Sequence, residues 1–372
     1  IIAGVGSVII FMPNIMILFF CIAIFEDTGY MARAAFLMDK IMHLIGLHGK
    51  SFIPMLMGFG CNVPAIMSAR TLESEKDRIL TILITPFMSC SAKLPIYIVL
   101  AGTFFSVRAG TVIFSIYLVG IVLSILTGRL FRSTLLKGAD APFVMELPPY
   151  RAPMLKSLLI HMWDRSKMFL KKMGGIILIG SVVVWTLSAF PRNTEYSFDY
   201  NGETEKIKAS YETEIKAGNV DNEILEKKKK ADILEITRAQ KAEQVEKSYM
   251  GRMGKTISPL FSPIGIDWRG GVALITGFVA KEIVVSTMAV LHAAGEESDA
   301  LQNALLSSKM TPLSALSMMI FVLLYLPCLA TVAAIKRETG SFKWMFFSIT
   351  YNTSIAWFAA FFVYQGGKLL GA

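Results

Sequence analysis

A heptapeptide early in the chain combines helix-breaking residues with a thiol and a carboxamide. It reads Gly58-Phe59-Gly60-Cys61-Asn62-Val63-Pro64. A helix cannot run undisturbed through such a segment, because glycine weakens a helix and proline breaks it. The flanking residues, 52–56 and 65–67, are apolar enough to lie at membrane depth, where non-helical backbone is tolerated only if protein buries it or it lines a watery cavity. The heptapeptide is therefore either a kink in a core helix or a substrate gate.

Two further thiols lie at interruptions of apolar runs. Cys90 and Ser91 lie between Pro86 and Pro95, and Cys328 follows a proline directly. Each proline frees backbone carbonyls of the preceding turn, and freed carbonyls that face a cavity are candidate cation ligands. All four cysteines of the chain lie in apolar segments at irregular spacing, which argues against a disulfide framework and against a zinc knuckle.

Two pairs of charged residues border or enter apolar segments. Glu26 and Asp27 end the first apolar run, where carboxylates either mark the membrane interface or offer hard oxygen ligands at a metal or proton entry site. Lys281 and Glu282 lie inside an apolar segment, where insertion costs roughly 2.5–3.5 kcal/mol for a lysine. We expect this second pair to face protein or water, either as a packing salt bridge or as part of a gate on the ion path.

The composition predicts a membrane protein that positions these residues on apolar helices. Of 372 residues 54% are hydrophobic, which is too much apolar surface for one soluble core. Runs near the roughly 20 residues that a bilayer requires occur at several places. They are 7–25, 79–105, 111–131, 174–190, 311–335 and 344–364, with a seventh at 270–291 that carries Lys281 and Glu282.

The formal net charge of +9 has a membrane explanation. Basic residues cluster at 33–50, 70–78 and 129–172, which is typical of cytoplasmic loops under the positive-inside rule and not of a nucleic-acid face. We therefore expect contacts with membrane lipids and no nucleic acid, and we assign no chemistry to the long basic segment 132–172. Because the chain starts at Ile1 without an initiator Met or a signal segment, we expect it to be part of a longer polypeptide.

One segment differs from the rest in composition. Residues 201–250 contain alternating charges, few aromatics and a glycine-asparagine turn, which predicts two polar helices in a hairpin outside the bilayer. The alternation of spans places this hairpin on the outer side.

An internal repeat organises the chain. The pattern Gly-[Leu/Ile]-x-x-[Lys/Arg], followed eight residues later by Gly-Phe, occurs at 46–59 and again at 265–278, and Cys-x-Ala triplets follow in the same order at 90–92 and 328–330. By counting spans the first unit begins inward and the second outward, so the units are inverted and the substrate site lies near the midplane. The second unit has Gly277 and the Lys281-Glu282 pair where the first has the heptapeptide.

These features predict an all-α polytopic membrane protein, built from an inverted repeat of two gate units with broken or re-entrant helices and an extramembrane helical hairpin. The expected divisions are a first gate repeat at 1–105, a transmembrane helix and basic cytoplasmic loop at 106–172, a second gate repeat at 173–335 with the hairpin inserted at 199–250, and a C-terminal transmembrane helix at 336–372.

Four motifs in order resemble the membrane domain of the bacterial ferrous iron transport protein B family. They are the heptapeptide with Ala65-Ile66, and the segments 26–33 (EDTGYMAR), 86–95 (PFMSCSAKLP) and 280–285 (AKEIVV). The resemblance covers nearly the whole chain apart from the hairpin. It implies a multi-pass importer of Fe2+ in the bacterial inner membrane, with gate regions like those of nucleoside permeases and an amino-terminal GTP-hydrolysing domain that this chain lacks. The segment Gly49-Lys50-Ser51 does not complete a phosphate-binding loop, because Leu44 stands where that motif requires glycine.

The resemblance also implies roles for particular residues. The family's suspected metal path falls on Cys61, Cys90 and Cys328, and thiolates and carboxylates are plausible ligands of ferrous iron. Candidate pathway or gate residues are Glu26, Asp27, Gly58, Gly60, Asn62, Pro64, Ser91, Gly277, Lys281 and Glu282. We expect Fe2+ as the transported substrate, no permanently bound cofactor and no enzymatic activity in this chain.

Partners and alternatives complete the prediction. The expected partners are the family's cytoplasmic G domain, small accessory proteins and a second copy of the chain. A nucleoside or other small-ion permease is the first alternative, although Asn62 alone is thin support for recognising a base. A cysteine-dependent membrane enzyme ranks last, because all four histidines, at 43, 48, 161 and 292, lie outside the expected spans.

Overall fold

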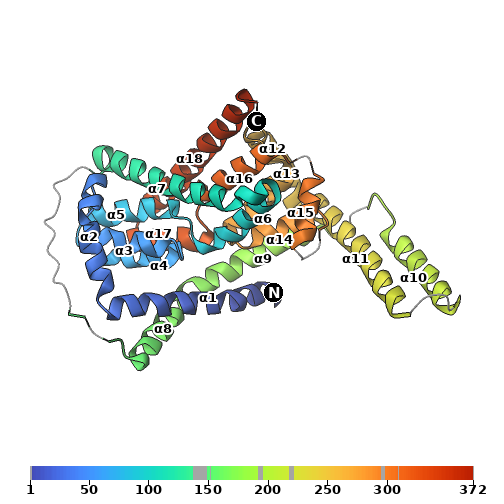
Figure 1. Cartoon of the computed structure of the whole chain (residues 1–372), viewed down its shortest axis with the longest axis horizontal. Helices are drawn as coiled ribbons and strands as arrows, with labels where there is room; N and C mark the ends of the chain where they lie inside the picture. Colours follow the sequence, from blue (N-terminus) through green and yellow to red (C-terminus); the bar gives the residue numbers. More distant parts are fainter. Residues whose placement is uncertain are drawn as a thin grey trace.

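The computed structural model describes residues 2–136, 149–150, 152–191, 196–217, 222–294, 298–308 and 310–371 (Figure 1). Every regular element within these ranges is helical, which confirms the all-α prediction. The proline-rich part of the basic segment and the turn of the polar hairpin lie outside the described residues.

The first part of the chain consists of short helices packed beside two longer ones. α1 and α2 meet at Gly29, whose φ of 76° is left-handed, and the two helices are bent by 80°. After α2, single 3-10 turns alternate with short helices because glycine, proline and serine recur every few residues. The elements are α1 (Ile2–Asp27), α2 (Tyr30–Ile45), η1 (Gly49–Ser51), α3 (Phe52–Gly58), α4 (Asn62–Ser68) and η2 (Ala69–Thr71).

The next stretch completes the first half of the body. Its helices are α5 (Glu75–Ile84), η3 (Thr85–Phe87), η4 (Ser91–Lys93), α6 (Leu94–Phe105), η5 (Ser106–Arg108) and α7 (Ala109–Thr134). α8 (Leu155–Phe169) then packs along α1 and passes through one π-helical turn, Leu170–Gly174, into the apolar helix α9 (Gly175–Ala189).

The polar segment forms the two helices that the sequence predicts. α10 (Tyr200–Ala217) and α11 (Asn222–Lys247) pack against each other and extend from one end of the body (Figure 1). The Glu243 carboxylate of α11 holds the start of α10 in place, and we call this region the base of the hairpin. It accepts hydrogen bonds from the Ser197 backbone N–H at 2.7 Å and from the Tyr200 hydroxyl at 2.8 Å. It also lies 2.8 Å from the Lys247 ammonium.

The second half of the body is also built of helices, several of which are short. Its helices are α12 (Tyr249–Phe261), η7 (Ser262–Ile264), α13 (Trp268–Val279), α14 (Ile283–Leu291), α15 (Ser298–Leu306), α16 (Pro312–Leu324), α17 (Leu329–Thr339) and α18 (Phe342–Leu369). α16 lies at the centre of the main core, where residues 318–324 are almost fully buried, and α18 packs along it.

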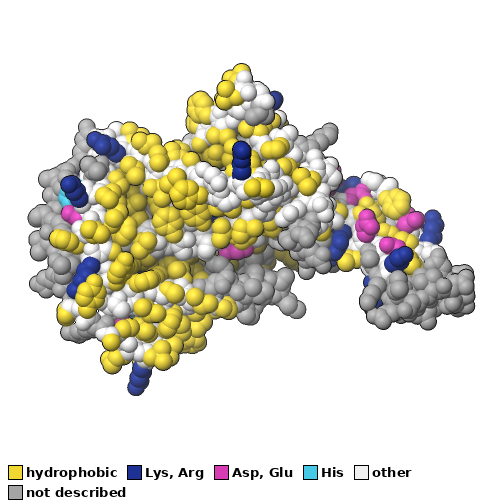
Figure 2. Space-filling view, in the orientation of Figure 1, with side chains coloured by type: hydrophobic (Ala, Val, Ile, Leu, Met, Phe, Trp, Pro, Cys, Tyr) yellow, Lys and Arg dark blue, Asp and Glu magenta, His cyan; other side chains and the backbone are white. Residues whose placement is uncertain are grey.

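Length and composition allow several described helices to cross a membrane. Three stretches qualify, Glu75–Thr134, Pro312–Thr339 and Phe342–Leu369, and the bent pair formed by Ile15–Asp27 and Tyr30–His43 is a fourth if it is counted as one span. Hydrophobic side chains cover much of the body, whereas acidic and basic side chains gather on the hairpin (Figure 2). Lys50, Arg70, Arg132 and Arg165 lie on or beside η1, η2, α5 and the carboxyl end of α1, which are away from the hairpin (Figure 1), and we call this end of the body the basic end.

The expected span at 311–335 is confirmed by length and composition as Pro312–Thr339, with a helix break inside it. The chain leaves the helix after Leu324 and re-enters it only at Leu329, because Pro327 cannot donate to the helical ladder. The expected segment at 270–291 is likewise two helices, α13 and α14, which fold back on each other.

Candidate functional site

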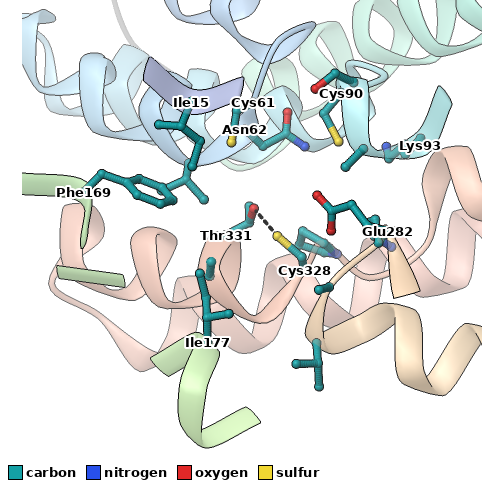
Figure 3. A pocket seen from close by; sticks show the side chains of 18 of the residues that line it. Ile15, Cys61, Asn62, Cys90, Lys93, Phe169, Ile177, Glu282, Cys328 and Thr331 are labelled. Carbon is teal, nitrogen blue, oxygen red and sulfur yellow. Dashed lines mark hydrogen bonds between the residues drawn. The ribbon is translucent and has the colours of Figure 1, made fainter. Parts of the chain in front are cut away.

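A central cavity of about 510 Å³ lies where four helix breaks meet (Figure 3). Two of these breaks separate α3 from α4 and α13 from α14, and the other two precede α6 and α17. We call this space the cysteine cavity. Its polar lining residues are Cys61, Asn62, Cys90, Ser91, Lys93, Lys281, Glu282, Ser286, Cys328 and Thr331.

The first break presents a thiol and a carboxamide to the cavity. Cys61 has extended backbone, with φ of −153° and ψ of 129°, and precedes the first residue of α4. That residue, Asn62, is only 5% exposed, and its Oδ1 has no hydrogen-bond partner among the described residues. Ser91 ties this break to the next one, because its backbone N–H and its hydroxyl both donate to the Gly60 carbonyl, at 3.2 and 2.9 Å. A buried acceptor without a partner is a position where a ligand can bind favourably.

The second break has the same backbone form with different side chains. Ala280 has φ of −148° and ψ of 127°, and it is followed by Lys281 and Glu282. α13 and α14 run back along each other, and the hydroxyls of Thr276 and Thr287 lie 3.1 Å apart across the pair. The fold-back places the Glu282 side chain on the cavity wall (Figure 3).

Two buried lysines donate hydrogen bonds to backbone carbonyls at the helix breaks. Lys281 Nζ donates to the Leu326 carbonyl at 3.0 Å and lies 3.1 Å from the centre of the Tyr325 ring. Lys93 Nζ donates to the Leu323 carbonyl at 2.7 Å and to the Pro86 carbonyl at 3.3 Å. The carbonyl of Pro86 itself is therefore already satisfied by an ammonium group, whereas cation binding by the carbonyls that Pro86 and Pro95 free in their preceding turns stays a prediction. Lys281 is likewise bound to a carbonyl and not to a carboxylate.

The three thiols share the cavity without forming a closed ligand set. Cys61, Cys90 and Cys328 all line it, and Figure 3 shows their sulfur atoms around the same space as the Asn62 carboxamide and the Glu282 carboxylate. Cys328 Sγ lies 3.1 Å from the Thr331 hydroxyl. Within the described part of the chain, no three His, Cys, Asp or Glu residues lie close enough to hold one metal ion together.

The other predicted residues lie around this space or toward the basic end. Gly58 is buried against Met88, and Gly277 is buried against Val284 and Tyr325. Pro64 and Glu26 line a second cavity of about 490 Å³, and neither touches the first. Asp27 ends α1 and lines neither of these two cavities. Cys21, which lies in none of the four motifs, is exposed.

Sequence reasoning missed three residues at the site. Lys93 is 2% exposed, and a lysine within an apolar run was the available signal. Thr331 lies one helical turn after Cys328 and therefore on the same face of α17. Phe169 comes from the basic segment to which we assigned no chemistry, and it lines the cysteine cavity with 3% of its surface exposed.

Fold and site together define the class of protein. Apolar helices of spanning length surround two folded-back helix pairs whose broken ends meet at one cavity, which is the arrangement of a membrane gate domain. The chain matches the family described as Gate, nucleoside recognition, over residues 8–104 and 170–342, and it belongs to that family. Residues 113–165 match the C terminus of the ferrous iron transport protein B.

Curated relatives named as iron transporters match the whole chain. A fusion of Fe(2+) transport protein A and the Fe(2+) transporter FeoB from Porphyromonas gingivalis is 50% identical, and the match covers 99% of this chain and 44% of the relative. The Fe(2+) transporters FeoB of Campylobacter jejuni and Methanocaldococcus jannaschii are 40% and 42% identical over 100% of the chain, which is 55% and 49% of their own lengths.

The chain thus spans about half the length of these relatives and corresponds to their membrane part, which confirms the resemblance. No solved structure gives a significant match.

Proposed function

We propose that the chain is the membrane domain of a ferrous iron transporter and that Fe2+ passes through the cysteine cavity. The observation that carries this proposal is the convergence of three thiols, an unpartnered carboxamide oxygen and a carboxylate on one cavity at helix breaks. The curated relatives are named for Fe2+ transport, which supports the choice of ion.

The ligand chemistry suits an ion that must bind and leave. Ferrous iron is a borderline cation that accepts sulfur, nitrogen and oxygen ligands. Conduction requires binding that is weak enough to release the ion, so a few protein ligands completed by water suit a transport site better than a closed cage. We propose that Cys61, Cys90 and Cys328 bind the ion in succession and not as one ligand set, with Asn62 Oδ1 and the Glu282 carboxylate supplying oxygen.

We propose further that the two gate units form an inverted repeat of re-entrant helix pairs. Three matched positions support this. Cys61 and Ala280 share one backbone conformation, Cys90 (φ −73°, ψ 158°) and Cys328 (φ −59°, ψ 156°) share another, and Gly46 and Gly265 are both left-handed, with φ of 79° and 74°. In Figure 1, α3 and α4 lie toward α2 at one end of the body, and α13 lies toward α12 at the other. The two pairs then enter the membrane from opposite faces.

The remaining parts of the proposal concern placement and partners. The positive-inside rule puts the basic end in the cytoplasm, so the chain is a multi-pass protein of the bacterial inner membrane that moves iron inward. A G domain in the same polypeptide and an accessory protein of the FeoA type are the proposed partners, because one relative is a fusion of transport protein A with FeoB.

A nucleoside permease is the second candidate, since the family is described by nucleoside recognition. The cysteine cavity offers little for a base. Phe169 is the one aromatic residue and Asn62 the one amide among its lining residues. A binding assay with nucleosides separates this reading from iron transport.

The test of the proposal is iron uptake by cells that carry the protein with single cysteine substitutions. Cys61→Ser and Cys328→Ser each remove a thiol from the cavity, and we expect uptake to fall to about a tenth or less, by analogy with the 10–100-fold losses seen around metal sites. Cys21→Ser is the matched control, because this thiol is exposed and lines neither cavity. Normal uptake by the cavity variants at wild-type abundance would remove the thiols from the mechanism.

A further inference from the structure

The second cavity has a lining that the transport proposal has not used. It measures about 490 Å³ and lies toward the basic end, with Lys50, Arg70 and Arg165 in its wall. Four methionines line it, at 31, 57, 67 and 168, and Glu26 is the one carboxylate among its lining residues. We call it the methionine cavity. Thioether sulfur favours softer metal ions over magnesium or calcium.

Three elements pass the two cavities in the same spatial order. On α1, Met12 and Ile15 line the cysteine cavity, and the next turns of the same face, Phe19, Ile22 and Glu26, line the methionine cavity.

The other two elements line the cavities in the same spatial order. On α4, Asn62 and Val63 are followed by Pro64 and Met67. α8 runs in the opposite direction, so Met168 of the methionine cavity comes before Leu170 of the cysteine cavity, which directly follows α8. The cavities are therefore consecutive spaces along one route and not unrelated hollows.

One residue of α8 belongs to both cavities. Phe169 is 3% exposed and lies in a cluster of buried apolar residues with Ile15, Phe19, Met57 and Val63. This cluster occupies the boundary between the two spaces. An apolar constriction excludes water and hydrated ions, which is one of the ways in which channels are gated.

The backbone beside this ring is suited to movement. The π-helical turn Leu170–Gly174 begins directly after Phe169, and π turns inside α-helices are rare and frequently lie at functional sites. The turn ends at Gly174 and Gly175, where an added Cβ would meet no atom within 4 Å. Conversion of the π turn to regular α-helix would change the register of α8 against α9 and rotate the Phe169 ring.

We propose that the cysteine cavity and the methionine cavity are consecutive chambers of one path for a divalent cation, and that the Phe169 ring is the gate between them. The inference rests on the proposed function for the identity of the ion, and on the geometry alone for the gate. The far end of the path lies at Glu26, whose carboxylate is paired with Arg165 at 2.7 Å. Release of that pair frees the carboxylate to bind the departing ion.

The test measures the access to Cys61 from the basic end and uses no iron. Inverted membrane vesicles that carry the protein are treated with a small, membrane-impermeant cationic thiol reagent, and the modification of Cys61 is followed by peptide mass mapping. We expect Phe169→Ala to raise the rate of Cys61 modification severalfold over wild type, and Phe169→Trp to lower it. Phe131→Ala is the control, because Phe131 is a buried phenylalanine that lines neither cavity.

Each outcome decides between the two proposals. An unchanged rate in Phe169→Ala, or an equal rise in Phe131→Ala, would overturn the gate and leave the cysteine test of iron transport untouched. A rise confined to Phe169→Ala supports the gate even if the cysteine variants transport iron normally. If Phe169→Ala does not reach the membrane, Phe169→Trp decides, since a rate that is not lowered contradicts the proposal.

Discussion

The two folded-back helix pairs share a backbone and differ in chemistry. The residue that leaves α3 for α4 and the residue that leaves α13 for α14 have φ and ψ values that differ by only a few degrees. The first pair carries Cys61 and Asn62 at this point, whereas the second carries Lys281 and Glu282. The same local fold therefore presents neutral, ligand-like groups from one side of the cavity and charged groups from the other.

The two helix pairs also differ in the hydrogen bonds that hold their breaks in place. Ser91 secures the first break through two bonds to the Gly60 carbonyl. On the other side of the cavity, Lys93 donates to the Leu323 carbonyl in the last turn of α16, and Lys281 donates to the Leu326 carbonyl between α16 and α17. Buried hydrogen bonds from charged groups are stronger than those from neutral hydroxyls. We infer that the side of the cavity formed by α13 and α14, which we call the second side, is rigid. The side formed by α3 and α4, the first side, is more easily displaced.

The largest expected effect comes from the lysine that joins the two units. Lys93→Met removes the donor of the Pro86 and Leu323 carbonyls, and a buried acceptor left without a partner costs about 1–3 kcal/mol. We expect the variant to lose about 2–6 kcal/mol of unfolding free energy by this reasoning. Thermal unfolding in detergent measures the loss.

Lys156→Met is the control for that variant, since this lysine is exposed on α8. If the two variants unfold at the same temperature, the buried lysine does not hold the breaks together, and the proposed rigidity of the second side fails.

The sequence predicted where helices stop but not what satisfies their ends. Glycines and prolines located the breaks around Cys61, Cys90 and Cys328, and the charge pattern located the hairpin. The hydrogen bond from Lys93 to the Leu323 carbonyl joins residues 230 positions apart, so no local sequence pattern predicts it. The position of Phe169 could not be predicted for a similar reason, because the basic segment has several aromatic residues and the cavity beside this one forms only once α8 lies against α1.

Alanine at Gly277 should destabilise the protein more than alanine at Gly58, and both losses should be smaller than that of Lys93→Met. A Cβ at Gly277 would lie 2.3 Å from Val284 Cγ2 and 2.6 Å from the Tyr325 hydroxyl, whereas a Cβ at Gly58 meets Met88 at 3.0 Å. Overpacking of a core costs about 1–3 kcal/mol, so Gly277→Ala should be destabilising by about that amount. Gly58→Ala should cost less than about 1 kcal/mol, because alanine's better helix propensity offsets the tighter contact.

Unfolding midpoints of the two variants, measured side by side, check this prediction. Each variant serves as the control of the other, since the substitution is the same and the positions correspond in the proposed repeat. Equal losses would mean that the second side is no more tightly packed than the first.

The smallest expected effect concerns the hairpin, which precedes α12 and has no counterpart among the described helices in the first half of the body. Bonds from the Lys247 side chain, from Ser197 and from Tyr200 lower the pKa of the Glu243 carboxyl from 4.5 to about 2. A group whose folded pKa is depressed contributes stability above its unfolded pKa and loses it as the pH falls through the folded value. The contribution of Glu243 is therefore complete at neutral pH and disappears between about pH 4.5 and pH 2.

Glu243→Gln should lower the unfolding free energy by about 1 kcal/mol at pH 7, the size of one ordinary hydrogen bond, with the gap to wild type closing as the pH falls toward 2. α11 packs on α14, so loosening the base of the hairpin should reach the second break and shift the unfolding midpoint of the body. Midpoints in detergent from pH 7 to pH 2 measure the gap, with Glu235→Gln, exposed on the same helix, as control. A gap that does not change with pH would contradict the role of the carboxylate, and an unshifted body midpoint would show that the hairpin does not support the second unit.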